Sequence, residues 1–138
     1  MINTEHFAQC IRTLECSMDF LRGSDPGSVE YEVYRNAVVK GFELSLETGG
    51  KLLRKTIRSY FGAPRAVDHL PFKDVFRHAA KHGLLGVEET ERWFAYRANR
   101  NDTAHDYGAG FAEETLILLP DFLADAKRLR EVLSDVQD

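Results

Sequence analysis

A stretch in the second half of the chain is dense in side chains that can act on phosphates. It reads Arg97-Ala98-Asn99-Arg100-Asn101-Asp102-Thr103-Ala104-His105-Asp106-Tyr107-Gly108. A guanidinium binds phosphate through a bidentate fork, and an imidazole transfers protons near neutral pH. RNA carries its own nucleophile, the ribose 2′-hydroxyl, so its cleavage needs only acid–base groups and a cation beside the developing negative charge. This motif segment (residues 97–108) therefore predicts metal-free chemistry on a phosphodiester.

The spacing within the motif segment restricts how its side chains could meet. On a continuous helix, Arg100 and His105 would point about 140° apart, so one phosphate meets both only if the helix breaks or a second chain contributes. Asn101 and His105, four residues apart, would share a face. The same spacing from Arg77 to His82 lacks the following asparagine and the tyrosine, and we treat it as coincidental. The competing interpretation of the motif segment is a helix C-terminus with polar capping residues.

Other reactive patterns are weak in the sequence. No serine lies in a Gly-x-Ser-x-Gly context, and no glycine-rich loop ends in Gly-Lys-Ser or Gly-Lys-Thr. Cys10 and Cys16 lack a nearby basic residue that would activate a thiolate, and we expect both to be buried and reduced. His78 and His82 could share a metal, but zinc requires three or four protein ligands, so surface histidines are the favoured interpretation. We expect neither a metal nor a cofactor.

Size and composition favour a single helical domain over residues 1–138. The chain is 43% hydrophobic and 29% charged, as in an ordinary globular protein. The sequence contains neither a recognisable signal peptide nor the roughly 20 consecutive apolar residues of a membrane helix, so we expect a cytoplasmic protein without membrane association. The net charge is −4, yet residues 51–100 hold 11 basic and 5 acidic residues, a net +6. This middle segment predicts either a polyanion-binding surface or ordinary solvated helix faces.

Apolar residues recur at three- and four-residue spacing, which predicts an all-α up-and-down bundle of four or five helices. The expected helices cover about residues 4–21, 29–60, 71–82, 87–100 and 111–136, with Thr4 capping the first and Gly83 ending the third. Gly49-Gly50 costs about 1 kcal/mol per glycine inside a helix, which predicts a tight helix crossing or a kink. Pro120 should bend the last helix. The apolar stripe of that helix is expected at Phe111, Leu118, Phe122, Leu129, Leu133 and Val136.

The motif segment and its surroundings resemble one known family. Residues 100–107 resemble the Arg-x4-His-x-Tyr motif of the HEPN superfamily, specifically the partners of minimal nucleotidyltransferases called nucleotidyltransferase substrate-binding proteins. Residues 42–47 with 51–53, residues 63–65, and residues 83–85 with Trp93 resemble further signatures of that family. The similarity spans most of the chain and is specific at the motif. Gly49-Gly50 departs from it, because members tend to have a small residue followed by an aromatic there, and Pro120 is also unexpected.

The resemblance implies a homodimer whose two motifs converge on one cleft. In toxins of the superfamily this cleft is a metal-independent endoribonuclease site. By the same resemblance, Arg100 would stabilise the scissile phosphate, and Arg97 would bind phosphate of the RNA or nucleotide. His105 would act as general acid or base. Asn101 would orient the reacting groups, and Asp102 is a weaker candidate for the catalytic set.

The resemblance also implies the toxin of a toxin–antitoxin pair. A minimal nucleotidyltransferase antitoxin would attach adenylyl groups to Tyr107, and such an anionic adduct would repel RNA phosphate. The alternative is a non-catalytic subunit that presents a substrate or nucleotide to the transferase, with the same arginines as a phosphate clamp. A dimerisation bundle without chemistry is a third possibility. Glu47 is expected to pair with a motif arginine inside the bundle or, as the favoured interpretation, to face solvent.

Overall fold

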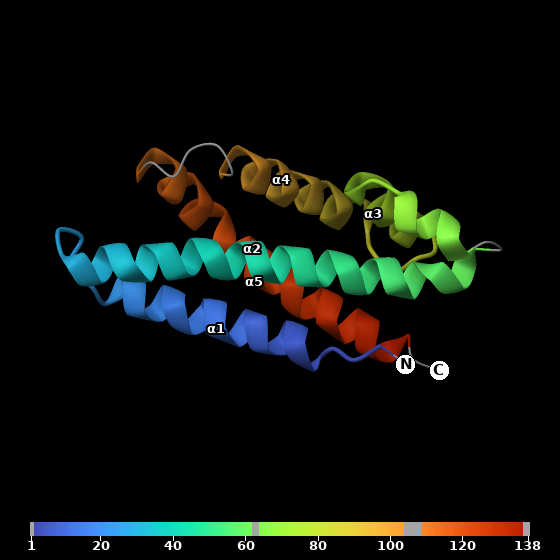
Figure 1. The fold of residues 1–138 in the computed structure, drawn as a ribbon, viewed down its shortest axis with the longest axis horizontal. Helices are drawn as coiled ribbons and strands as arrows, with labels where there is room; N and C mark the ends of the chain where they lie inside the picture. The colour runs from blue at the N-terminus through green and yellow to red at the C-terminus, as the bar shows by residue number, and fades with distance from the viewer. Residues whose placement is uncertain (1, 62–63, 104–108, 137–138) are drawn as a thin grey trace.

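The structure, a computed structural model, describes residues 2–61, 64–103 and 109–136. Its five α-helices are α1 (Glu5–Arg22), α2 (Val29–Ile57), α3 (Phe72–Lys81), α4 (Val87–Thr103) and α5 (Ala109–Asp135). Two short 3-10 helices, η1 (Arg58–Tyr60) and η2 (Pro64–His69), follow α2 (Figure 1). The described ranges contain no β-strand, and the predicted all-α bundle is confirmed.

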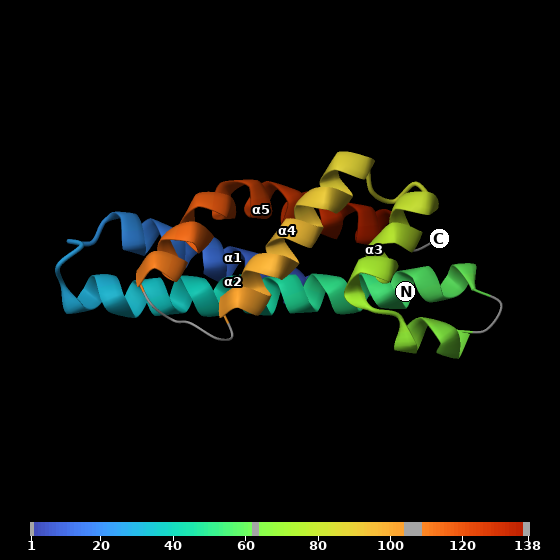
Figure 2. The same cartoon turned by 90° about the horizontal axis from the view of Figure 1, so that it is seen from above.

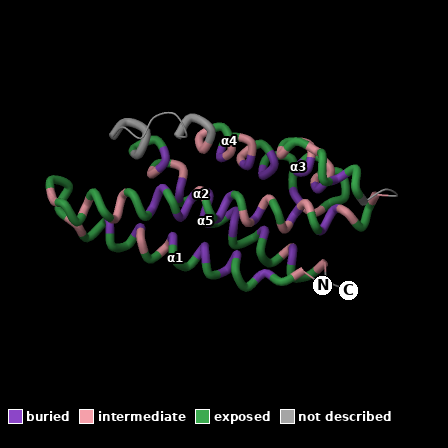
Figure 3. Tube along the Cα trace, in the orientation of Figure 1, coloured by how far each residue is buried: buried purple, intermediate pink, exposed green. Residues whose placement is uncertain are grey.

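Helix α2 is the axis around which the other helices are arranged. It contacts all four of them, with α1 on one side and with α3 and α4 on the opposite side (Figure 1). Its buried residues occupy neighbouring positions such as Val38 with Val39 and Leu46 with Ser45, so a large part of its circumference is buried. Buried positions line the inner sides of the helices in Figure 3. In the part of the chain that the structure describes, no helix has both the length and the apolar character to cross a membrane.

Local polar contacts set the helix ends. The Ser28 hydroxyl accepts a hydrogen bond from the Tyr31 N–H at 3.1 Å and caps α2. Thr4 occupies the N-cap position of α1, as predicted, but its side chain makes no capping hydrogen bond; the Asn3 side chain accepts from the Glu5 N–H at 2.9 Å. The Thr4 hydroxyl lies 3.2 Å from the hydroxyl of Ser134, so it ties the start of α1 to the end of α5.

The turn after α3 needs a glycine, as predicted. Gly83 has a φ of +79°, the left-handed region that residues with a Cβ rarely adopt. Its N–H donates to the Ala80 carbonyl oxygen at 3.0 Å, and the Leu84 N–H donates to that of Ala79 at 2.9 Å. The chain can therefore reverse and enter α4 within a few residues.

The core centres on a cluster of aromatic rings contributed by four helices. Trp93 of α4 is fully buried, with its ring centroid 5.2 Å from that of Phe76 and 5.6 Å from that of Phe122. Phe122 also meets Phe42 of α2 edge-to-face, at 4.9 Å. Edge-to-face contacts of this kind stabilise the fold by about 1 kcal/mol beyond the stabilisation that comes from burying the apolar surface. The cluster thus joins α2, α3, α4 and α5.

The predicted tight crossing occurs where α1 packs on α2. Gly41, Ser45 and Gly49 recur every four residues on one face of α2 and are buried. A Cβ added at Gly41 would lie 3.3 Å from the Leu14 Cδ1 atom. At Gly49 it would lie 3.0 Å from Cζ of Phe7, which is fully buried. The small residues therefore let α1 approach the α2 backbone closely.

Helix α5 follows the predicted range but uses a different buried stripe. Leu119 is fully buried, whereas Leu118 and Val136 are only half-buried. The predicted Phe122, Leu129 and Leu133 are buried, and the side chain of Phe111 lies outside the described residues. Pro120 lies inside the helix, and α5 changes direction along its length in Figure 2, as expected for a proline. Leu118 and Leu119 both lie at helical spacing from Phe122, so spacing alone does not decide which of the two is buried.

The expectations for the cysteines are half wrong. Both thiols are free, and Cys10 is buried. Cys16 is exposed, because six residues turn it away from the core face of α1. Cys10 also has a basic neighbour: the Nε2 atom of His6, one turn earlier, lies 3.7 Å from its Sγ atom.

Gly49→Val should lower the free energy of unfolding by about 1–3 kcal/mol, because a branched side chain cannot fit between Phe7 and Leu129 without displacing them. Urea denaturation followed by circular dichroism measures this change. Glu47→Val, which places the same side chain on the exposed face of α2, should cost less than about 1 kcal/mol. Equal losses in the two variants would show that the crossing at Gly49 is not tightly packed.

Candidate functional site

The motif segment begins in the last two turns of α4. Hydrogen bonds join Arg92 to Asp125 and Asn99 to Thr115, so α4 and α5 run in opposite directions side by side. The C-terminal end of α4 and the N-terminal end of α5 consequently lie at the same end of the bundle (Figure 2). The position of the motif is therefore set by how α4 is attached to α5.

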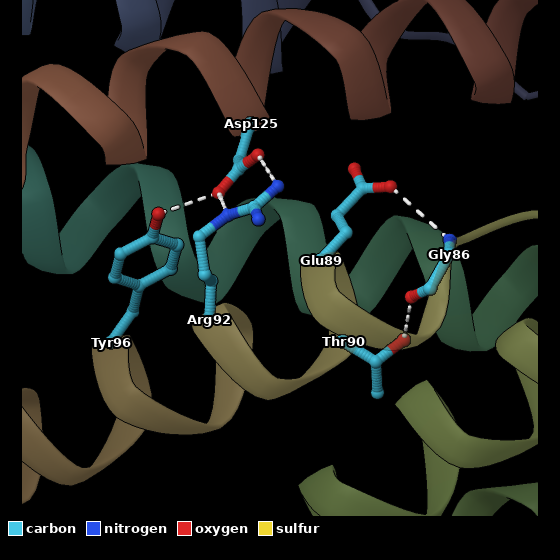
Figure 4. Close-up of polar contacts among 6 residues, drawn as sticks. All are labelled: Gly86, Glu89, Thr90, Arg92, Tyr96 and Asp125. Atoms are coloured by element: carbon cyan, nitrogen blue, oxygen red, sulfur yellow. Dashed lines mark hydrogen bonds and ion pairs between the residues drawn. The ribbon is translucent and has the colours of Figure 1, made fainter.

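The main attachment is a buried carboxylate with two partners (Figure 4). Asp125 of α5 is only 3% exposed. Its Oδ2 and Oδ1 atoms accept hydrogen bonds from Arg92 Nε and Nη2 at 2.8 and 2.9 Å, a bidentate pair. The Tyr96 hydroxyl donates to Oδ2 at 2.5 Å. Arg92 and Tyr96 are four residues apart, so they share one face of α4.

This arrangement changes the acid–base properties of the two α4 residues. Burial, and then the hydrogen bond to Asp125, raise the pKa of the Tyr96 phenol well above its ordinary value. The hydrogen bonds to Asp125 raise the pKa of the Arg92 guanidinium. Tyr96 thus stays a neutral donor and Arg92 a cation, which is the combination that a buried carboxylate requires.

Both ends of α4 have further polar contacts. At its start, the Glu89 carboxylate accepts from the Gly86 N–H at 3.4 Å, and the Thr90 hydroxyl donates to the Gly86 carbonyl oxygen at 2.7 Å (Figure 4). Nearer its end, the hydroxyl of the fully buried Thr115 donates to the Asn99 side-chain oxygen at 3.0 Å. The turn of α4 that precedes the motif arginine is therefore fixed against α5.

An aromatic ring of α3 positions the Arg97 side chain. Its guanidinium carbon lies 5.0 Å from the centroid of the Phe72 ring, within cation–π range. Phe72 stacks on Phe76 with ring centroids 4.4 Å apart. A Cβ added at Gly50 of α2 would lie 3.1 Å from the Phe72 ring, so the missing side chain at Gly50 leaves room for this ring. Phe72 is half-buried rather than fully inward, since one part of it supports Arg97.

The predicted site residues divide between described and undescribed parts of the chain. Arg97 and Arg100 are half-buried on α4, three residues apart. Asn101 and Asp102 lie on the last turn of α4, and their side chains are outside the described part. His105 and Tyr107 lie outside the described residues. The structure therefore brings Arg97 and Arg100 to one helix end, while the meeting of Arg100 with His105 stays a prediction.

Glu47 is exposed on α2, so the interpretation as a solvated carboxylate is confirmed.

The two histidines of α3 pack against aromatic rings. The His82 ring stacks on Tyr60 at 4.2 Å, and the His78 ring meets Phe61 edge-on at 4.9 Å. They thereby join α3 to the end of α2, and only His82 is fully on the surface. Among the residues that the structure describes, no three His, Cys, Asp or Glu side chains are close enough to hold a metal ion.

Sequence reasoning missed the Asp125 network. A signal for it exists, since Asp125 lies between Phe122 and Leu129 on the apolar stripe of α5, where a carboxylate is buried and must be paired. Arg92 and Tyr96, one turn apart on α4, are a matching cation and hydroxyl. The sequence does not say which of the many arginines turns inward.

Comparison with known proteins now assigns the family. The family model described as "Nucleotidyltransferase substrate binding protein like" matches residues 3–135. The chain belongs to this family. A member from Haemophilus influenzae, "Probable ribonuclease HepT", is 30% identical over 108 residues, covering 78% of this chain and 72% of the relative.

Two solved structures have the same fold as this chain. The Haemophilus influenzae protein HI0074, reported as the fold of a substrate binding domain of a nucleotidyltransferase, has a TM-score of 0.82 at 23% identity, covering 96% of this chain and 99% of that one. The tri-AMPylated HEPN toxin of Shewanella oneidensis, in complex with an MNT antitoxin, has a TM-score of 0.66 at 14% identity, covering 95% and 98%. At these identities the likeness concerns the fold.

Asp125→Asn should lower the free energy of unfolding by about 2 kcal/mol, because the amide cannot satisfy both N–H donors of Arg92 and leaves that cation without its counter-charge. Chemical denaturation measures the loss. Asp121→Asn, an exposed position on the same helix, should change stability by less than about 0.5 kcal/mol. A stable Asp125→Asn protein would contradict the role of the network.

The raised pKa of Tyr96 predicts a stability loss at high pH. Above the ordinary tyrosine pKa of about 10, an unfolded chain releases the phenolic proton while the folded chain retains it, so alkali favours unfolding. The free energy of unfolding should fall by up to about 1.4 kcal/mol per pH unit from this group. Tyr96→Phe should remove that part of the slope in urea titrations above pH 10. If the free energy of unfolding falls with pH equally in the unchanged protein and in Tyr96→Phe, the raised pKa of Tyr96 is refuted as the cause.

Proposed function

We propose that this protein is the toxin of a toxin–antitoxin pair, a metal-independent endoribonuclease that a minimal nucleotidyltransferase silences. The observation that carries the proposal is the Arg-x4-His-x-Tyr motif at the end of α4 in a chain of the HEPN superfamily. The Haemophilus relative named as a probable ribonuclease supports the activity. The Shewanella toxin, bound to an MNT antitoxin, supports the partner.

The proposed reaction uses the RNA's own hydroxyl as nucleophile. His105 removes the 2′-hydroxyl proton as the 2′-oxygen attacks phosphorus, and the resulting imidazolium donates that proton to the 5′-oxygen as the bond from phosphorus to this oxygen breaks. The products are a 2′,3′-cyclic phosphate and a 5′-hydroxyl. Arg100 stabilises the additional negative charge on the phosphate oxygens, and Asn101 orients the reacting groups, with Asp102 beside it.

A homodimer completes this site. Arg100 and His105 would diverge by about 140° on one continuous helix, so two converging motifs offer one phosphate an arginine and a histidine. The attachment of α4 to α5 through Asp125 supports such a site, because catalytic side chains must be held within fractions of an ångström.

Tyr107 is the proposed point of silencing. It lies two residues after His105, so an adenylyl group there brings a negative charge beside the position of the RNA phosphate. The tri-AMPylated state of the Shewanella toxin supports modification of this kind.

Arg100→Ala and His105→Ala should each lower RNA cleavage by at least about 100-fold and relieve growth inhibition, because each removes a group needed in the transition state. Cleavage of total RNA in the presence of EDTA, and growth after induced expression, measure the two effects. Arg128→Ala and His69→Ala, at exposed positions, are the matched controls and should cleave like the unchanged protein.

Full toxicity and cleavage in folded Arg100→Ala and His105→Ala proteins would disprove catalysis by this pair. Nucleotide binding without RNA cleavage by the unchanged protein would instead identify the non-catalytic partner subunit.

A further inference from the structure

The basic side chains of the middle segment divide into two groups in the structure. Arg58 and Arg92 form ion pairs with acidic side chains, and Arg54 donates to a backbone carbonyl oxygen at 2.5 Å. Lys73 and Arg97 form no ion pair with any residue that the structure describes. A cation without a carboxylate beside it keeps its charge for an anionic ligand.

Three cations of the middle segment, two of them without an ion pair, lie on aromatic rings where α3 contacts α4. The Nζ atom of Lys73 lies 5.5 Å from the centroid of Phe94, and the guanidinium carbon of Arg77 lies 5.4 Å from the same centroid. Arg97 lies over Phe72, as described above. A ring attracts a cation without adding negative charge. The three cations, here called the α3–α4 cation face (Lys73, Arg77 and Arg97), are thus positioned but not neutralised by the rings.

One acidic side chain reduces the charge of this face. Asp74 lies 2.9 Å from the Nη1 atom of Arg77. Three cations and this carboxylate leave a net charge of +2 at the face. Lys73 and Arg77 are both exposed, so a phosphate can reach them without displacing the core.

The face leads along α4 to the motif. Phe94, Arg97 and Asn101 are spaced three and four residues apart, so their positions lie on one side of the helix. The distance along the axis from residue 94 to residue 101 is about 10 Å. Arg100 follows Arg97 by three residues. A polyanion that crosses Lys73 and Arg77 and continues past Arg97 therefore reaches the motif segment.

We infer that the α3–α4 cation face binds the sugar–phosphate backbone of single-stranded RNA on one side of the scissile bond. This inference rests on the proposed function, for which it supplies the substrate contacts. A lysine provides a point charge, and two arginines provide planar forks for phosphate oxygens. Cations combined with half-exposed rings suit unpaired RNA, whose flexible backbone and free bases can follow such a face.

Binding of a fluorescein-labelled single-stranded RNA of mixed sequence, measured by anisotropy across salt concentrations, tests the inference. All proteins carry His105→Ala so that the RNA stays intact. Adding Lys73→Gln and Arg77→Gln should weaken binding about tenfold and reduce the slope of log affinity against log salt by about 1.4, or about 0.7 per lost phosphate contact. Arg97→Gln should reduce the salt slope by about 0.7, and Arg97→Lys should largely restore the slope.

The matched control is Lys51→Gln with Lys55→Gln, which removes two charges at the same four-residue spacing on α2. These lysines line a different pocket, together with His6, Thr48 and Leu52. The control should keep the affinity and the salt slope. Circular dichroism spectra identical to the parent show that each variant is folded.

Each other outcome contradicts a specific claim. Unchanged affinity and slope in the Lys73 and Arg77 variant would overturn the inference. Intact RNA binding with loss of the nucleotidyltransferase complex would also overturn it, because the face would then be a protein interface. Cleavage is measured separately with His105 restored. If the protein cleaves RNA but the Lys73 and Arg77 variant binds RNA with unchanged affinity, only the inference about the cation face is refuted. If binding depends on the face but the protein with His105 restored does not cleave RNA, only the proposed nuclease function is refuted.

Discussion

Burial of the Asp125 carboxylate between α4 and α5 constrains the end of the molecule that carries the motif. A buried charge without partners costs several kcal/mol, so α4 must present Arg92 and Tyr96 at this level of α5 and at no other. This requirement fixes both the rotation and the vertical register of α4. Nearer the end of α4, Asn99 and Thr115 meet in the same antiparallel arrangement. These contacts therefore also set the positions of Arg97 and Arg100 on α4.

The sequence predicts the helices well, because apolar periodicity and turn residues are local signals. The range of α2, the turn at Gly83 and the tight crossing at Gly49 follow from such signals and are confirmed. The buried stripe of α5 is predicted one residue off at Leu118, because Leu118 and Leu119 both lie at helical spacing from Phe122 and spacing alone does not choose between them. The sequence analysis does not predict that Cys16 is exposed, because too few apolar positions around it define the buried face of α1.

The candidate site is predictable only in part, for a physical reason. Residue types and spacing identify Arg100 and Arg97, because phosphate chemistry needs guanidinium groups. Which cations are neutralised depends on contacts between helices that are distant in sequence, such as Arg92 with Asp125 and Lys73 with Phe94. The net +6 of residues 51–100 is therefore a sum over groups with different surroundings.

The close approach of Phe72 to Gly50 has an evolutionary consequence. The space above this glycine is filled by a ring from α3. A ring at position 50 and a ring at position 72 would compete for one volume, so the two positions should covary among homologues. Since Phe72 also supports Arg97, a substitution in the central helix can alter the selection on a surface arginine that it never touches.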